Sequence, residues 1–183
     1  MAAITLREAA AALATSHVIF SAVGVGNAAM QKPDTAAAAT AAGDVVASGA
    51  KAVKVVARMY SGGGLDAAAC AGEVTFTDPA ARCEGVGEVS EAFRALKWCR
   101  PETIEAPRAQ PVSDSELLVH LHQRYFGFLV VRSALCVKLS ADGRVAELEE
   151  RWNGAPLLWW SPFRWTRRVN GMLSSLLTPL LLR

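Results

Sequence analysis

The sequence lacks the cysteine spacing of disulfide frameworks and structural zinc sites. None of its four cysteines belongs to a CxxC pair, and 183 residues can bury a core large enough to fold without covalent links. We therefore expect free thiols in a reducing compartment, and an intracellular protein rather than a secreted one. The four are Cys70, Cys83, Cys99 and Cys136.

Signatures of nucleotide binding and covalent catalysis are also missing. The glycines of the GVGEV segment do not follow a strand with GxGxxG spacing, and the sequence contains no phosphate loop and no nucleophile–base triad. These absences predict a protein without a cofactor.

Acidic residues are missing after Glu150. Residues 151–183 hold five arginines and no acid, a formal charge of +5, whereas residues 1–150 hold 14 basic and 17 acidic side chains. A basic excess confined to a tail does not form a groove that could follow a nucleic-acid backbone. We therefore expect no nucleic-acid partner.

Residues 1–43 contain many alanines and few charges. The run from Ala9 to Met30 has no Lys, Arg, Asp or Glu, but its polar side chains make it too polar for a transmembrane helix. A signal peptide would also need a clearer basic start. Two interpretations stay open: a plain leader or extra helix, or an organelle-targeting segment. Pro33–Gly43 has the composition of a linker.

The pattern changes at Asp44, where helical periodicity begins. Val53, Val56, Ala57 and Tyr60 share one stripe, and the following SGGG ends that helix. A short helix (Leu65–Cys70), an alternating strand ending at Asp78, and a helix with apolar residues at Val86, Val89, Phe93 and Leu96 are expected next.

The region from Glu116 to Trp152 predicts strands. Glu116–Phe126 alternates, Leu129–Leu139 keeps its apolar residues at one parity, and Asp142-Gly143 is a hairpin signal before Val145–Trp152. The order of helix, short helix, strand, helix and a meander of three or four strands predicts an α+β fold. Its curved antiparallel sheet would carry helices on one face.

Three motifs in this order resemble the NTF2-like superfamily, which includes ketosteroid isomerase and the SnoaL-like polyketide cyclases. They are the first helix running into SGGGLDAA, then VTFTDPAARCEG with its helix, and the hairpin VKLSADGRVAELEERWNG. The resemblance covers Gly49–Gly154 and implies a domain of residues 44–154 shaped as a cone around an apolar pocket. Because such cones serve enzymes, binding modules and scaffolds, it implies a cavity but no chemistry.

The resemblance gives Asp78 a candidate catalytic role. In ketosteroid isomerase the Asp of a similar Val-Glu-Asp-Pro segment is the base that moves the proton, and apolar neighbours would raise the pKa of Asp78. The alternative is that Asp78 only caps its turn. The tyrosine and acid positions of the isomerase fall on Val56 and Leu135, which cannot donate hydrogen bonds, so ketosteroid isomerase proper is not predicted. Tyr60, one turn after Val56, is a candidate donor or a packed residue.

His120 and His122 lie on one face of the same expected strand. If that face is inside the cone, His120 is the candidate acid–base partner of Asp78. A zinc site would need a third ligand that the sequence does not offer, so we expect no metal. Alternation does not tell which face is inside.

The last strand places Glu150 and Trp152 on one face, opposite Glu147, Glu149 and Arg151. The end of this strand is either part of a polar pocket rim or a solvated charged edge with one packed tryptophan. Tyr60, Phe76, His122 and Trp152 are the candidate ligand-binding residues.

The tail, residues 155–183, predicts an amphipathic helix starting at Ser161 and Pro162. One face carries Arg164, Arg167, Arg168, Gly171, Ser174 and Ser175; the other carries Trp165, Val169, Met172, Leu173, Leu176 and Leu177. This fits a membrane-surface helix, or a helix packed on its own domain or across a homodimer, and it is too short to span a bilayer.

Three functions follow as hypotheses. The first is a SnoaL-like domain that binds a small apolar molecule. The second is a lyase or isomerase that uses Asp78 with His120 or Tyr60. The third is an interaction module held to a membrane or protein by residues 155–183. The sequence does not decide whether the protein is an enzyme.

Overall fold

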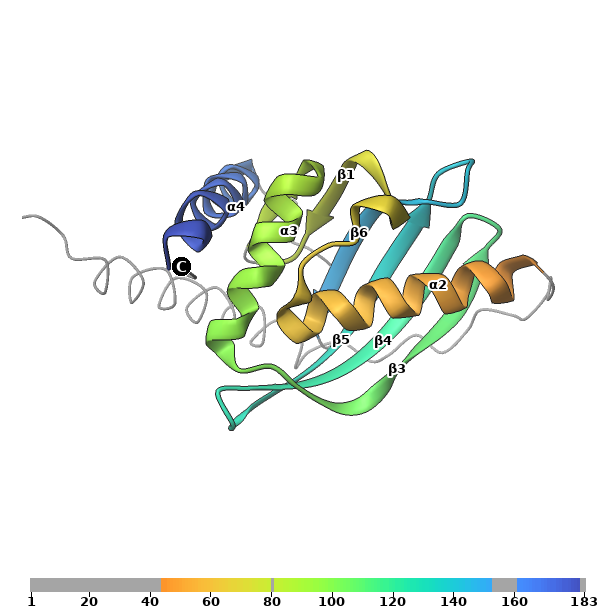
Figure 1. Ribbon diagram of the computed structural model, residues 1–183, viewed down its shortest axis with the longest axis horizontal. Helices are drawn as coiled ribbons and strands as arrows, with labels where there is room; N and C mark the ends of the chain where they lie inside the picture. Colours follow the sequence, from red (N-terminus) through yellow and green to blue (C-terminus); the bar gives the residue numbers. More distant parts are fainter. Residues whose placement is uncertain (1–43, 80, 153–160, 182–183) are drawn as a thin grey trace, which may run out of the picture.

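The structure, a computed structural model, describes residues 44–79, 81–152 and 161–181 (Figure 1). The predictions for the leader and linker in residues 1–43, and for 155–160 and 182–183 of the tail, lie outside the described residues. The division into segments 1–43, 44–154 and 155–183 stays a prediction.

Six strands form one curved sheet in the order β2-β1-β6-β5-β4-β3 (Figure 1). Neighbouring strands are antiparallel except β1 and β6, which pair in parallel. The prediction of an antiparallel sheet is therefore wrong for this pair. The strands are β1 (Cys70–Thr77), β2 (Arg82–Glu84), β3 (Glu102–Ser113), β4 (Glu116–Tyr125), β5 (Leu129–Leu139) and β6 (Val145–Trp152).

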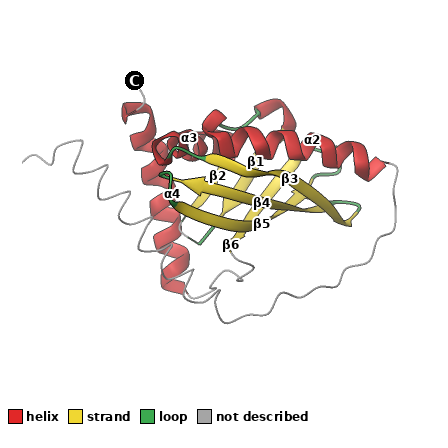
Figure 2. Ribbon diagram, turned by 90° about the horizontal axis from the view of Figure 1, so that it is seen from below, coloured by secondary structure: helices red, strands yellow, loops and turns green. Residues whose placement is uncertain are grey.

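Helices α2 (Asp44–Arg58) and α3 (Gly85–Ala95) lie along one side of the sheet, which confirms the predicted α+β class (Figure 2). Three short helical turns complete the helical part: η1 (Met59–Gly63) follows α2, η2 (Ala67–Ala69) precedes β1, and η3 (Leu96–Cys99) follows α3. Asp66 caps η2, accepting a hydrogen bond from the Ala68 N–H at 3.1 Å. The core lies between the helices and the inner face of the sheet.

The glycines after Tyr60 end the first helix, as predicted. Gly62 and Gly64 have φ values of +77° and +72°, which residues other than glycine rarely adopt. On the stripe, Val56 and Tyr60 are buried, whereas Val53 and Ala57 are only partly buried. Ala52, Val55 and Met59 complete the buried face.

Strand β3 was not predicted at these residues, although the predicted meander of three or four strands left room for one more strand. It contains Pro107 and Pro111, lies at the edge of the sheet, and is mostly exposed. Proline is tolerated at a sheet edge because the missing N–H faces no partner strand. The three-residue strand β2 was not predicted.

Helix α4 (Ser161–Leu181) packs against α3 and β2, so the tail helix is confirmed and covers its own domain. It docks with its polar and small residues, not with its apolar ones. Arg167, Asn170, Gly171, Ser174 and Thr178 are buried, whereas Trp165, Met172, Leu173 and Leu176 are exposed. Among the described residues, no helix has the length and apolar content needed to cross a bilayer.

Candidate functional site

Polar side chains gather at one end of the inner face of the sheet. Strand β4 points Leu117, Val119 and Leu121 into the core, and the same parity then brings in Gln123. Ser133 on β5 and Glu150 on β6 are buried on this face too. The Gln123 amide donates to the Thr103 hydroxyl at 3.2 Å, so this polar group has a protein partner.

Glu150 is the central group of this cluster. It is 4% exposed, and burial raises its pKa to about 7, with the nearby charge of Asp78 acting in the same direction. Hydrogen-bonding side chains of Ser133, Tyr60 and Trp152 lower the pKa but do not cancel the effect. Burial therefore favours the protonated form of the Glu150 carboxyl.

Asp78 is buried at the end of β1. Its backbone N–H donates to the Ala81 carbonyl oxygen at 2.9 Å, and its Oδ1 accepts a hydrogen bond from the Ala81 N–H. The carboxylate thus caps its turn, which was the alternative to a catalytic role. Its charge also reaches the cluster, because it raises the pKa values of Glu150 and Tyr60. The catalytic role of Asp78 stays a prediction.

Tyr60 brings a hydroxyl to the cluster from the helical side. Its ring packs edge-on against Phe93, with centroids 5.1 Å apart. Burial first, and then the charge of Glu150, raises the pKa of Tyr60 well above its usual value. The Glu150 carboxyl interacts with this hydroxyl, but among the described residues no group meets ordinary hydrogen-bond geometry to it. A buried hydroxyl without a well-formed hydrogen bond is costly.

Tyr125, at the end of β4, is a site residue that sequence reasoning missed. Burial raises its pKa well above the ordinary value, and the charges of Glu150, Cys99 and Asp78 add to the effect. The sequence could have indicated Tyr125 as an inward-facing residue, because it lies on the same face of β4 as Leu121 and Gln123. Glu150 likewise lies on the same face of β6 as Leu148, which is fully buried.

The two histidines lie outside the cone. His120 is exposed, because it alternates with the buried Val119 and Leu121. The condition for pairing His120 with Asp78 is therefore not met. His122 shares the outer face, and its Nδ1 lies 2.9 Å from Glu105 Oε1 on β3, so its prediction as a pocket residue is corrected as well.

No metal site is formed by the described residues: no three His, Cys, Asp or Glu side chains come together in a way that could hold an ion. The four cysteines are free thiols, as expected, and Cys70, Cys83 and Cys136 are buried.

Phe76 and Trp152 both lie on the inner face. The Phe76 ring packs edge-on against Phe93, with centroids 4.7 Å apart, and is buried in the core. Trp152 is partly buried and pairs across the sheet with Ser133. Val56 and Leu135, the positions without a donor, are fully buried core residues.

The cluster brings two carboxyls and a phenol together in a desolvated part of the inner face. Burial and the charge of Asp78 raise the pKa of Glu150, which favours its protonated form. A protonated carboxyl and a phenol can both donate hydrogen bonds.

No protein-family model and no curated protein matches the sequence. Solved structures show a backbone likeness at low identity. A steroid delta-isomerase from Pseudomonas aeruginosa is 14% identical with a TM-score of 0.47, covering 79% of this chain and 96% of that one. A de novo designed protein with a curved β-sheet is 17% identical with a TM-score of 0.45, covering 69% and 97%.

A third similar structure is a bacterial protein with a cystatin-like fold from Silicibacter pomeroyi, 15% identical with a TM-score of 0.43, covering 64% of this chain and 82% of that one. Likeness at this level carries no argument about function. By its own strand order and helix placement, the described structure has the α+β fold that the sequence predicted, with one curved six-stranded sheet and helices on one face. The resemblance to the NTF2-like superfamily stays a prediction.

Proposed function

We propose that the protein binds a small, mostly apolar molecule that carries one polar oxygen, with that oxygen at Tyr60 and Glu150. The observation that carries this proposal is the burial of Glu150 beside Asp78, with a pKa of about 7. A buried carboxyl that is easily neutralised can donate a hydrogen bond to a carbonyl or accept one from a hydroxyl. The neighbouring Val56, Phe76 and Phe93 supply apolar contacts.

Native mass spectrometry of the full chain, followed by denaturation, tests this proposal. We expect a co-purified molecule that is released on denaturation, with lower occupancy in Glu150→Gln and Tyr60→Phe. His120→Ala, on the outer face, is the matched control and should keep the molecule. A wild-type protein that is empty, and whose melting temperature no apolar alcohol or ketone raises, would show that the cluster has only a structural role.

A proton-transfer enzyme, an isomerase or a lyase, is the second candidate. The specific observation in its favour is the pairing of two carboxyls with a buried phenol. Asp78 would accept a proton from a carbon next to a carbonyl, while the protonated Glu150 or Tyr60 donates a hydrogen bond to the carbonyl oxygen as it gains charge.

Deuterium incorporation separates the two candidates. In heavy water, an enzyme would place deuterium at a carbon of the co-purified molecule, and Asp78→Asn would stop this without releasing the molecule. Retention of the molecule with no deuterium uptake would leave the binding function and exclude the enzyme.

A further inference from the structure

Three aromatic side chains are exposed together at one end of the molecule. Trp98 belongs to η3, and Phe126 and Phe128 belong to the turn between β4 and β5, where Phe128 is 79% exposed. The Phe126 N–H donates to the Cys99 carbonyl oxygen at 2.6 Å, which joins the turn to η3. The rings of Phe126 and Phe128 stack with centroids 6.3 Å apart. We call these three residues the aromatic patch.

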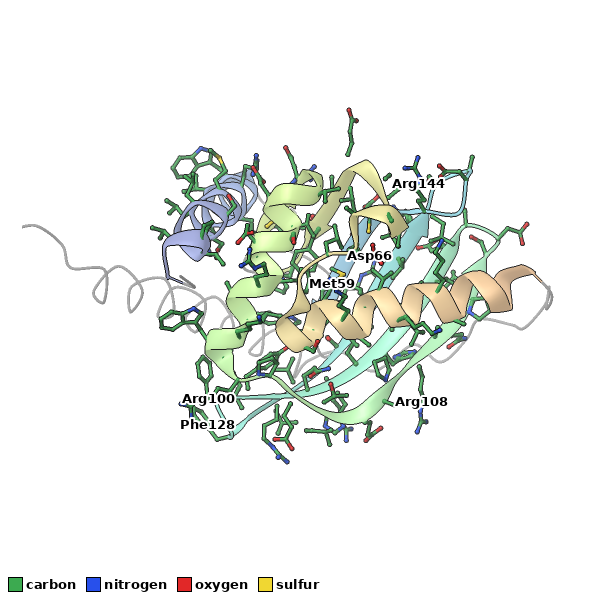
Figure 3. The ribbon with its side chains drawn as sticks, viewed as in Figure 1. Met59, Asp66, Arg100, Arg108, Phe128 and Arg144 are labelled. Atoms are coloured by element: carbon green, nitrogen blue, oxygen red, sulfur yellow. The ribbon has the colours of Figure 1, made fainter. Side chains whose placement is uncertain are left out.

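Basic side chains surround the aromatic patch. Lys97 and Arg100 flank Trp98 in the sequence, and Figure 3 shows Arg100 beside Phe128. Arg58, at the end of α2, belongs to the same surface, because η1 packs against η3 and the Lys97 side chain covers Gly62. All three basic side chains are exposed, and among the described residues none of them forms an ion pair.

Two carboxylates on the neighbouring elements α3 and β3 already have basic partners. Glu91 pairs with Arg94 at 2.7 Å, and Glu102 pairs with Arg124 at 2.9 Å. The charge of Arg58, Lys97 and Arg100 is therefore left for a partner with negative charge. An acidic or anionic surface is the complementary one.

Helix α4 exposes a second apolar surface. Its polar face is fixed inward by Arg168, whose guanidinium contacts Glu88 at 2.6 and 3.0 Å, and by Gly171, which lies against the backbone of β2. Most of its apolar side chains consequently point away from the domain: Met172, Leu173 and Leu176 are exposed, and Trp165 is 69% exposed. In Figure 1, α4 and the β4–β5 turn both lie toward the end of the molecule opposite the start of α2.

We propose that the aromatic patch and the apolar face of α4 bind the surface of an anionic phospholipid membrane. Tryptophan is favoured at the depth of lipid headgroups, and each of the two surfaces presents one. Unpaired basic residues next to exposed aromatics match lipid phosphates above acyl chains, and an amphipathic helix with its apolar side outward can lie in the plane of that interface. A protein partner of matching shape would have to cover both a protruding turn and a helix.

Flotation of the full chain with vesicles tests the proposal. We expect binding to phosphatidylcholine vesicles that contain phosphatidylserine, weaker binding to phosphatidylcholine alone, and loss of binding at high salt. Reversal of two charges in Lys97→Glu/Arg100→Glu should weaken partitioning at least about tenfold. The aromatic double variant Trp98→Ser/Phe128→Ser and the helix variant Trp165→Ser/Leu176→Ser should each reduce it strongly.

Two matched controls lie elsewhere on the surface. Arg108→Glu/Arg144→Glu makes the same change in net charge at sites away from the patch (Figure 3), and Val112→Ser removes an exposed apolar side chain from the edge strand β3. Both should bind vesicles like the wild type. All substituted residues are exposed, and thermal melting confirms that the variants remain folded.

Three results would overturn the proposal. The first is a wild-type protein that does not float with anionic vesicles. The second is binding that the aromatic and charge variants leave unchanged. The third is a dimer in sedimentation velocity that Trp165→Ser/Leu176→Ser dissociates, because a second copy would then cover the apolar face of α4.

Discussion

Glu150 on β6 lies directly opposite Leu135 on β5, and both side chains are buried on the inner face of the sheet. The resemblance to ketosteroid isomerase implied a protonated carboxylic acid at the position of Leu135, but a leucine side chain has no carboxyl group. Opposed residues of two antiparallel strands project from the same face at short distance, about 5 Å between Cβ atoms. The neighbouring strand therefore brings a carboxyl to the region where the resemblance implied one, and Tyr60 brings a phenol one helical turn after Val56.

Glu150→Gln should flatten the pH dependence of stability. The pKa of Glu150 is about 7 in the folded protein, against an ordinary value of 4.5. The folded state holds this proton where the unfolded chain has lost it, so the stabilisation is complete below pH 4.5 and is lost as the pH rises through 7. The loss is on the order of 3 kcal/mol, and the glutamine variant should not show it.

Urea unfolding at a series of pH values measures this effect. Glu147→Gln, on the outer face of the same strand, is the control and should keep the wild-type profile in this range. Parallel pH profiles for wild type and Glu150→Gln would contradict a raised pKa at Glu150.

Tyr60→Phe should change the free energy of unfolding by no more than about 1 kcal/mol, because the hydroxyl has no well-formed hydrogen bond to lose within the described residues. Tyr60→Ala should cost about 3 to 5 kcal/mol through the cavity it leaves against Phe93. Since the Tyr60 side chain lowers the pKa of Glu150, the phenylalanine variant should raise that pKa further. Infrared titration of the carboxyl band measures the pKa of Glu150. A lower pKa of Glu150 in Tyr60→Phe than in the wild type would contradict an interaction between the two side chains.

Gly171→Ala should loosen α4. A Cβ at this position would lie 2.1 Å from the Arg82 carbonyl oxygen, so helix or strand must move. We expect a cost of about 1 to 3 kcal/mol in thermal or urea unfolding, and faster amide exchange in α4. Gly87→Ala in α3 is the matched control, because nothing lies within 4 Å of its Cβ and alanine favours a helix. It should gain about 0.5 to 1 kcal/mol; equal effects at both glycines would contradict the close contact.

Arg168 and Glu88 should be coupled in a double-mutant cycle. The guanidinium makes two contacts with the carboxylate, at 2.6 and 3.0 Å, and lowers the pKa of Glu88 against the effect of burial. Because both side chains are partly exposed, we expect only about 1 kcal/mol of coupling, decreasing with salt. The cycle uses Arg168→Ala, Glu88→Ala and the double variant in urea unfolding. Additive effects would show that α4 is held by packing alone.

The local elements could be predicted because their signals are local. Alternation identified β1, β4, β5 and β6, and the Asp142-Gly143 turn follows from the positive φ that Gly143 adopts at +75°. The parallel pairing of β1 with β6 could not be predicted from strands that lie far apart in the chain. It depends on how the helices return the chain to the sheet.

The candidate site was predicted only in part. Asp78 and Tyr60 were identified from motif and spacing, and both are buried near Glu150. His120 was misplaced because alternation groups residues by face without telling which face the helices cover. The chemistry of Glu150 comes from desolvation, and no sequence pattern records how much water surrounds a side chain.

The sequence by itself determined the α+β order, the helix ends and the two faces of the tail helix, because propensity, turn chemistry and periodicity act between residues close in the chain. The tertiary structure alone decided which face of each element is buried. Helix α4 shows this most clearly. Its periodicity predicted the two faces but left open which of them packs, and Arg168 on Glu88 and Gly171 on β2 turn most of the apolar side chains outward. Steric fit and ion pairing with distant residues decided the orientation, and the periodicity of the helix does not contain them.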